Sequence, residues 1–170
     1  MCTLYFYISM IFPFISSDQL LFWCMTYEEY LTLLDQWSAY YHFEKRDIQE
    51  GLDVDRMFYK QSTEASKMGM VDRFIYIKNV PDNIDANWAR QFSSGLYEYS
   101  RQYKQTFGRV FRSMMIVNPV MVVNTITPEL YSFIMDYCPK QFKSMEFPAI
   151  FQLSTRDLYF YQKTPFWGAL

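Results

Sequence analysis

The sequence predicts an α/β domain built on a mixed sheet of about four strands. Apolar runs at Phe74–Val80 and Met114–Val123 have the composition of strands, and a segment with helical periodicity lies between them. This order of strand, helix and strand is that of a βαβ unit, whose two strands lie parallel in one sheet. A third observation, the pattern from Pro148 to Phe160, predicts a β-hairpin as a further part of the sheet.

The first strand and the helix after it have clear sequence signals. Phe74–Val80 carries apolar side chains on both sides, which is typical of a strand covered by helices on both faces. Asp85 is a candidate helix cap. Large apolar side chains then recur every three or four residues until Gly108, at Trp88, Phe92, Leu96, Tyr99, Tyr103 and Phe107. This spacing predicts one apolar helix face.

The second strand contains Asn118 and Pro119 in its middle. Proline has no N–H group for the sheet ladder, so we expect either a bulge or two shorter strands there. After this strand, Thr127 and Pro128 predict the start of a short helix, which Pro139 ends. Pro148 then introduces the hairpin, with its turn at 154–157.

From residue 71 onward, the order βαβα followed by a β-hairpin resembles that of the thioredoxin-like fold. That family has a proline before its third strand, and Pro148 occupies this place. The resemblance implies an order of elements and not an activity. The loop after the first strand, residues 81–85, has no cysteine to act as a thiolate, and no segment of the sequence matches the final helix of that fold.

Two extra helices are expected before the sheet. Thr26 and Glu29 form a capping box, which predicts a helix that begins at once and ends near a charged run at 44–47. Asp53 is a candidate cap for a second helix ending at Gly69, with one apolar face made of Val54, Met57, Phe58, Ala65 and Met68.

The first 24 residues are apolar and stand apart from residues 25–170, which we expect to form a single domain. Asp18 is the only charged residue among them, and no basic residue flanks them to set a membrane orientation. Three interpretations stay open: a buried strand and short helix of the domain, a membrane anchor or partner-binding segment, or an upstream extension of a natural protein that begins at Met25.

Composition narrows the class of function. With 51% hydrophobic and 20% charged residues, the chain of 170 residues is globular in character. A net charge of −2 gives no field for nucleic acid. The three cysteines, Cys2, Cys24 and Cys138, form no Cys-x-x-Cys pair, and the glycine-rich phosphate-binding motifs are missing. We therefore predict a cytoplasmic protein with no cofactor, no metal and no catalytic set.

Four polar residues are the candidates for ligand binding. Asp82 and Asp85 follow the first predicted strand, whereas Asn118 and Asn124 lie within and after the second. The carboxyl ends of parallel strands are where open α/β sheets usually bind ligands, so these side chains could line one crevice. The alternative is structural, with Asp82 in a turn and Asp85 as a helix cap. A weaker candidate is a magnesium site made of Glu146, Asp157 and Lys163, whose spacing matches no known pattern.

The sequence alone favours a binding function. Aromatic residues make up 21% of the chain, and Phe166 and Trp167 near its end are candidate anchors for a protein partner or another copy of the chain. We expect a non-catalytic soluble domain that acts through protein–protein interaction. The alternatives are a small ligand-binding protein or enzyme using the strand-end crevice, and a membrane-associated protein held by residues 1–24.

Overall fold

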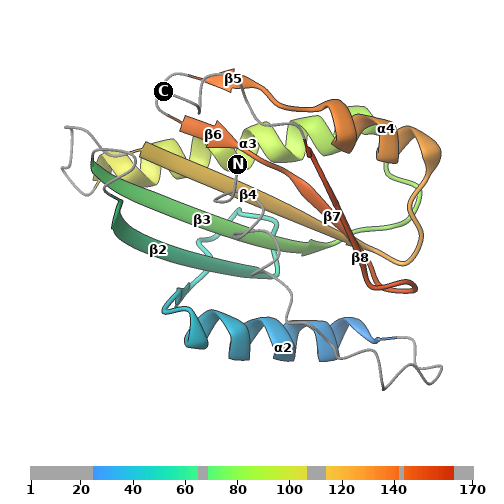
Figure 1. The fold of residues 1–170 in the computed structure, drawn as a ribbon, viewed down its shortest axis with the longest axis horizontal. Coiled ribbons are helices and arrows are strands. Elements are labelled where there is room, and N and C mark those ends of the chain that lie inside the picture. The colour runs from blue at the N-terminus through green and yellow to red at the C-terminus, as the bar shows by residue number, and fades with distance from the viewer. Residues whose placement is uncertain (1–24, 65–68, 107–113, 142–143, 163–170) are drawn as a thin grey trace.

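The computed structural model of the chain describes residues 25–64, 69–106, 114–141 and 144–162. Within these residues, eight strands form one mixed sheet in the order β1-β2-β3-β4-β6-β5, with β7 also beside β4 and β8 beside β7 (Figure 1). The elements in chain order are α2 (Tyr27–Tyr40), β1 (Glu44–Arg46), β2 (Arg56–Glu64), β3 (Gly69–Asn79), α3 (Ala86–Thr106), β4 (Met114–Val123), α4 (Pro128–Asp136), β5 (Lys140–Gln141), β6 (Ser144–Glu146), β7 (Ala149–Gln152) and β8 (Asp157–Phe160).

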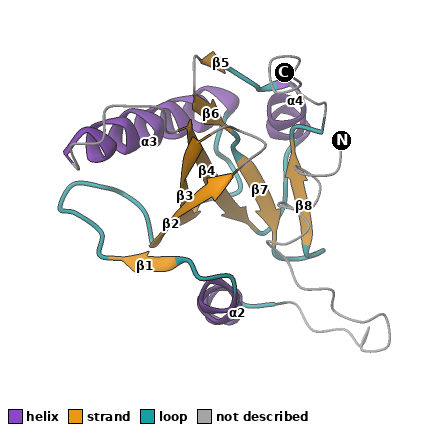
Figure 2. Ribbon diagram, turned by 60° about the vertical axis from the view of Figure 1, so that its left-hand side comes forward, coloured by secondary structure: helices purple, strands orange, loops and turns teal. Residues whose placement is uncertain are grey.

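The sheet is the middle of three layers. Helix α2 covers one face, and α3 with α4 covers the other (Figure 2). On the α2 side, Tyr30, Leu34 and Trp37 pack with residues of β2, β3, β4 and β7. On the opposite side, Leu96 and Tyr97 of α3 pack against β3 and β4, and the buried residues of α4 pack against β4 and β7. Apolar side chains on both faces of the central strands are therefore buried.

The predicted βαβ unit is confirmed. β3 and β4 are parallel neighbours, with Phe74 opposite Val117 and Ile77 opposite Val120. The helix between them begins where the sequence predicts, because Asp85 Oδ1 accepts a hydrogen bond of 2.6 Å from the backbone N–H of Trp88. The expectation that the helix ends at Gly108 falls outside the described residues.

Pro119 does not divide β4, which is one strand along its length. Backbone hydrogen bonds from Phe147 N to Val117 O and from Leu153 N to Val123 O show that odd-numbered residues of β4 face β6 and β7. Pro119 therefore faces the junction between these two short strands. β6 pairs with β4 only as far as Val117, and β7 pairs with it from Val120 onward. The missing N–H group of Pro119 therefore lies where one partner strand ends and the next begins, and β4 itself continues.

The predicted second helix before the sheet is wrong, because the segment that begins it is strand β2. β2 pairs with β3 along its length in antiparallel register, from Arg56 opposite Ile77 to Glu64 opposite Gly69. Met57 and Phe58 are adjacent in sequence and both buried, but they belong to core clusters on opposite sides of the sheet. That alternation is the period of a strand. Only α2 precedes the sheet among the described helices, and it has the predicted capping box.

The C-terminal hairpin is confirmed, whereas the strand count and the thioredoxin-like order are matched only in part. β7 and β8 pair antiparallel, with Phe151 opposite Leu158. Two further strands, β1 and β2, precede β3, and two short strands, β5 and β6, lie between α4 and β7. The sheet is therefore larger than the four strands expected. Pro148 does lie directly before β7.

Candidate functional site

The edge of the sheet at which β3, β4 and β7 end brings together two of the four predicted ligand-binding residues. Asp82 follows β3, and its Oδ1 accepts hydrogen bonds from the backbone N–H groups of Asn124 at 2.7 Å and Thr125 at 3.1 Å. Asn124 follows β4, and its carbonyl oxygen accepts from the hydroxyl of Ser154, which follows β7. These contacts join the loops that leave three neighbouring strands. The carboxylate of Asp82 is thereby engaged in holding backbone.

The other two predicted residues lie apart from this contact. Asp85 caps α3 through Trp88. Asn118 lies within β4, where its Nδ2 donates to the carbonyl oxygen of Phe147 at 3.2 Å. That contact is at the point where β6 gives way to β7, far along the strand from Asn124. The proposed anchors Phe166 and Trp167 lie outside the described residues.

Replacing Asp82 with alanine is expected to lower the free energy of unfolding by about 1–2 kcal/mol, because two hydrogen bonds to a charged acceptor are lost while water can reach both donors. Hydrogen exchange of the amides of Asn124 and Thr125 should accelerate in the variant, as NMR can measure. Asp82→Asn keeps an acceptor oxygen and should retain part of the protection. Unchanged exchange at both amides would contradict this role of Asp82.

A second carboxylate at the same edge was not found from the sequence. Asp55 Oδ2 accepts from the hydroxyl of Tyr27 and from the backbone N–H of Asn79, both at 2.7 Å. Burial raises the pKa of Tyr27, and its hydrogen bond with Asp55 raises it further, so the phenol stays protonated and donates. Lys78 pairs with Asp53 and lies 3.8 Å from Asp55. Asp53, predicted as a helix cap, is therefore an ion-pair partner instead.

A buried carboxyl group lies between the sheet and the two helices on one face. Glu146 of β6 is 1% exposed. Its Oε1 accepts hydrogen bonds from the hydroxyl of Ser93 in α3 at 2.5 Å and from that of Tyr137, at the end of α4, at 3.0 Å. Burial raises the pKa of Glu146, while the two hydrogen bonds act in the opposite direction. The carboxyl group thus links β6 to both helices.

Two further pairs of hydroxyl groups lie between α3 and the sheet. The hydroxyls of Tyr97 and Ser144 are 2.6 Å apart, and those of Tyr76 and Ser100 are 2.8 Å apart. Ser93 and Ser100 are two helical turns apart on the buried side of α3, each fully buried. Two serines in the middle of an apolar helix face, and a glutamate between Met145 and Phe147, were the sequence signals for this cluster. Its hydrogen bonds fix how α3 sits on the sheet.

The suggested magnesium set is not assembled. Glu146 lies opposite Val117 of β4, whereas Asp157 lies opposite Gln152, which in turn pairs with Val123 near the other end of the same strand. Lys163 lies outside the described residues. Among the residues that the structure describes, no group of three or more histidine, cysteine, aspartate or glutamate side chains is placed to hold a metal ion.

The described surface includes four exposed large apolar side chains, those of Leu33, Tyr40, Ile48 and Tyr131. No helix in the described part of the chain has both the length and the apolar character needed to cross a membrane. Comparison of the chain with protein-family models, curated proteins and solved structures finds no match.

Proposed function

We propose that this chain is a non-catalytic domain that acts by binding another protein, and that the outer side of α2 takes part in the contact. The observation that carries the proposal is the exposure of Tyr40, 76%, together with that of Leu33, 38%, on a helix whose inner side already belongs to the core. The two residues are seven apart, so they lie two turns from each other along one side of the helix.

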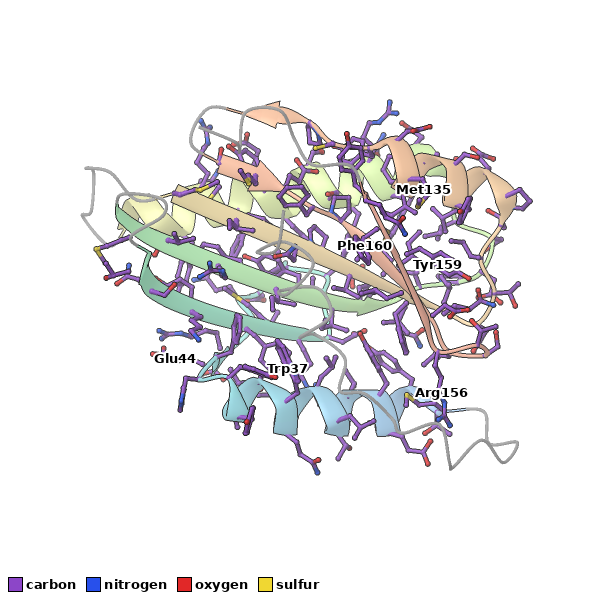
Figure 3. The ribbon with its side chains drawn as sticks, in the orientation of Figure 1. Trp37, Glu44, Met135, Arg156, Tyr159 and Phe160 are labelled. Atoms are coloured by element: carbon purple, nitrogen blue, oxygen red, sulfur yellow. The ribbon has the colours of Figure 1, made fainter. Side chains whose placement is uncertain are left out.

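Exposed apolar side chains on such a helix suit a protein partner. The inner side of α2 uses Tyr30, Leu34 and Trp37 to cover the sheet, and Figure 3 shows Trp37 where α2 meets the sheet. Tyr40 and Leu33 therefore add nothing comparable to the stability of the fold. A tyrosine offers a large apolar area and a hydroxyl group at little cost in side-chain entropy, which is why tyrosine is enriched among interface anchors.

The polar groups of the molecule support the same proposal. Asp82 and Asp85 bind backbone N–H groups of loops and of a helix end. Glu146 is buried beneath two helices and is engaged by their hydroxyl groups. Each of these carboxylates has a structural task that its contacts account for, and a carboxyl group that is 1% exposed cannot reach a substrate unless a helix moves.

The test compares two doubly substituted full-length chains expressed in their native cells. Leu33→Lys with Tyr40→Lys places charge on the proposed contact, and Thr32→Lys with Ala39→Lys places the same charge on another exposed pair of α2 residues, also seven apart. Proteins that co-purify with each chain are quantified by mass spectrometry, and self-association is measured by sedimentation. We expect the first variant to lose a partner, or self-association, at least roughly tenfold, and the control to keep it. Equal retention by both variants would remove α2 from the proposal.

A further inference from the structure

Helix α2 covers only part of its face of the sheet. The core cluster beneath it contains Val120 and Val122 of β4, so the even-numbered residues of this strand face α2. Ile116, nearer the start of β4, is on the same face but belongs to a separate buried cluster. Among the described residues, this strand-start cluster contains none from α2, and it consists of Val71, Ile116, Met145 and Phe147, with Met114 and Cys138 packed against it. This end of the face therefore needs a covering element other than α2.

Two cationic side chains lie at the border between the two clusters. On β3, Arg73 comes between Val71 of the strand-start cluster and Ile75 of the cluster beneath α2. Arg73 is 4% exposed, and its Nη1 donates to the hydroxyl of Ser62 at 2.6 Å. Lys60 of β2 lies opposite Arg73. Burial lowers the pKa of Lys60, and the positive charge of Arg73 lowers it further. A carboxylate at this border would stabilise both cations.

The sequence offers one segment with the matching charge. Asp72, next to Arg73, faces the other side of the sheet, where it accepts from Tyr59 and Gln61. Five segments lie outside the described residues, and four of them, 65–68, 107–113, 142–143 and 163–170, carry basic residues and no acid. The fifth, residues 1–24, has Asp18 as its only charge, and the residues before Asp18 are mostly apolar. This segment therefore complements both the cations and the strand-start cluster.

The first 24 residues also have the reach that this site requires. They lead directly into α2, which is 14 residues, or about 21 Å, long. Arg73 lies near the far end of that helix, because Lys60 opposite it donates to the carbonyl oxygen of Tyr41, the residue after α2, at 2.7 Å. Asp18 precedes Met25 by seven residues, which span up to about 23 Å when extended. An extended stretch beside α2 can therefore carry Asp18 back to Arg73.

We propose that residues 1–24 dock on the α2 face of the sheet, with Asp18 paired with Arg73 and the apolar residues before Asp18 over the strand-start cluster. Residues 19–24 run beside α2 in the opposite direction. The apolar run then belongs to the core of the domain and is not a membrane anchor. The inference goes beyond the proposed function and does not depend on the contact assigned to the outer side of α2.

The first test measures how fast chymotrypsin cleaves the full-length chain within residues 1–24, with the products identified by mass spectrometry. Asp18→Asn keeps the size of the side chain and removes its charge, so it should raise the cleavage rate at least about fivefold by populating the undocked segment. Gln19→Asn is the matched control and should change the rate less than about twofold. Equal cleavage of Asp18→Asn and the wild type would overturn the proposal.

An exchange of charges tests whether Arg73 is the partner. Asp18→Arg and Arg73→Glu should each raise the cleavage rate more than about tenfold, and the double variant should return it to within about threefold of the wild type. If Arg73→Glu does not fold alone, recovery of folding by Asp18→Arg supports the same pair. A double variant that is no better than Arg73→Glu would overturn the pairing.

Photocrosslinking locates the segment without disturbing the pair. A benzophenone side chain replaces Phe14 in the full-length chain, which is irradiated in the presence of phosphatidylcholine vesicles. We expect crosslinks within one chain to Met114 or Met145 of the strand-start cluster. Crosslinks between two chains would assign the face to a second copy, and crosslinks to lipid would make the segment an anchor. Either result would overturn the proposal.

This inference and the proposed function can fail separately. Leu33→Lys with Tyr40→Lys should leave the cleavage rate and the crosslinks unchanged, because both residues are on the exposed side of α2. Loss of partner capture in that variant with normal protection of residues 1–24 would support both proposals. Rapid cleavage of the wild-type segment together with α2-dependent capture would overturn the docking of residues 1–24 and leave the proposed function standing.

Discussion

Replacing Tyr30 with alanine is expected to lower the free energy of unfolding by about 3–5 kcal/mol, the usual cost of removing a buried aromatic side chain. Tyr30 is 2% exposed. Its ring stacks on that of Phe151, with centroids 4.4 Å apart and 13° between the ring planes. Because Phe151 lies in β7, this contact fixes α2 on a strand more than 100 residues away in sequence. Urea denaturation at constant pH measures the loss.

Tyr40→Ala is the matched control, since it is the same substitution in the same helix. Tyr40 is 76% exposed and belongs to none of the core clusters. Its ring meets that of Tyr41 edge-on, with centroids 4.8 Å apart, so its removal should cost at most about 1 kcal/mol, well below the cost at Tyr30. Equal effects at both positions would contradict the packing of α2 on the sheet. A large loss at Tyr30 and a small one at Tyr40 would also show that Tyr40 is available to a partner at little cost to the fold.

The starts of α2, α3 and α4 could be predicted because their signals are local, whereas α2 ends at Tyr40 and the charged run expected to end it contains strand β1. The capping box of Thr26 and Glu29, the cap at Asp85, and Thr127 followed by Pro128 each satisfy N–H groups within three residues of the capping side chain. Such chemistry does not depend on the rest of the chain. The βαβ unit was predictable for a related reason, because its strands are apolar on both faces and its helix has one continuous apolar side.

β2 shows where local reasoning fails. Val54, Met57 and Phe58 fit a helical face, and the same stretch also fits alternation between two faces of a strand. The decision comes from β3, which pairs with β2 along its length and supplies the partners of its backbone groups. Nothing within residues 53–64 records that pairing. The error is therefore one of tertiary context overriding a short-range pattern.

The contacts of the candidate sites could be predicted only in part, for the same reason. That Asp82 lies in a turn was predictable, but its partner Asn124 is 42 residues away. Glu146 and Ser93 are separated by 53 residues, and nothing near Glu146 in sequence announces a serine above it. The residue types at a contact can be read from the sequence, whereas the pairs require the fold. This limits prediction of any site assembled from separate elements.

Glu146→Gln is expected to make the stability of the protein less sensitive than that of the wild type to a rise in pH above about 4.3. Burial raises the pKa of Glu146 in the folded state above that of an unfolded glutamate, so the folded protein holds this proton more tightly. Its contribution to stability is then fully present below the unfolded pKa, about 4.3, and is lost as pH rises through the folded pKa. Glutamine keeps an acceptor for Ser93 and Tyr137 but cannot ionise.

As pH rises above about 4.3, the free energy of unfolding of the Glu146→Gln variant should therefore increase relative to that of the wild type. The increase should be at most about 1.4 kcal/mol per pH unit. Urea denaturation from pH 4 upward, in steps of about half a unit, measures it. Tyr137→Phe removes one of the two donors that stabilise the carboxylate, so the loss of stability should extend to higher pH in that variant.

Glu98→Gln provides the matched control, because Glu98 is exposed on α3 and pairs with Arg101 across the helix surface. Its substitution should change stability by less than about 0.5 kcal/mol, with little dependence on pH. A flat difference for Glu146→Gln over the same range would mean that Glu146 is not held as a neutral acid. If the wild type instead becomes more stable relative to Glu146→Gln as pH rises, the carboxylate, and not the acid, is the form that joins β6 to α3 and α4.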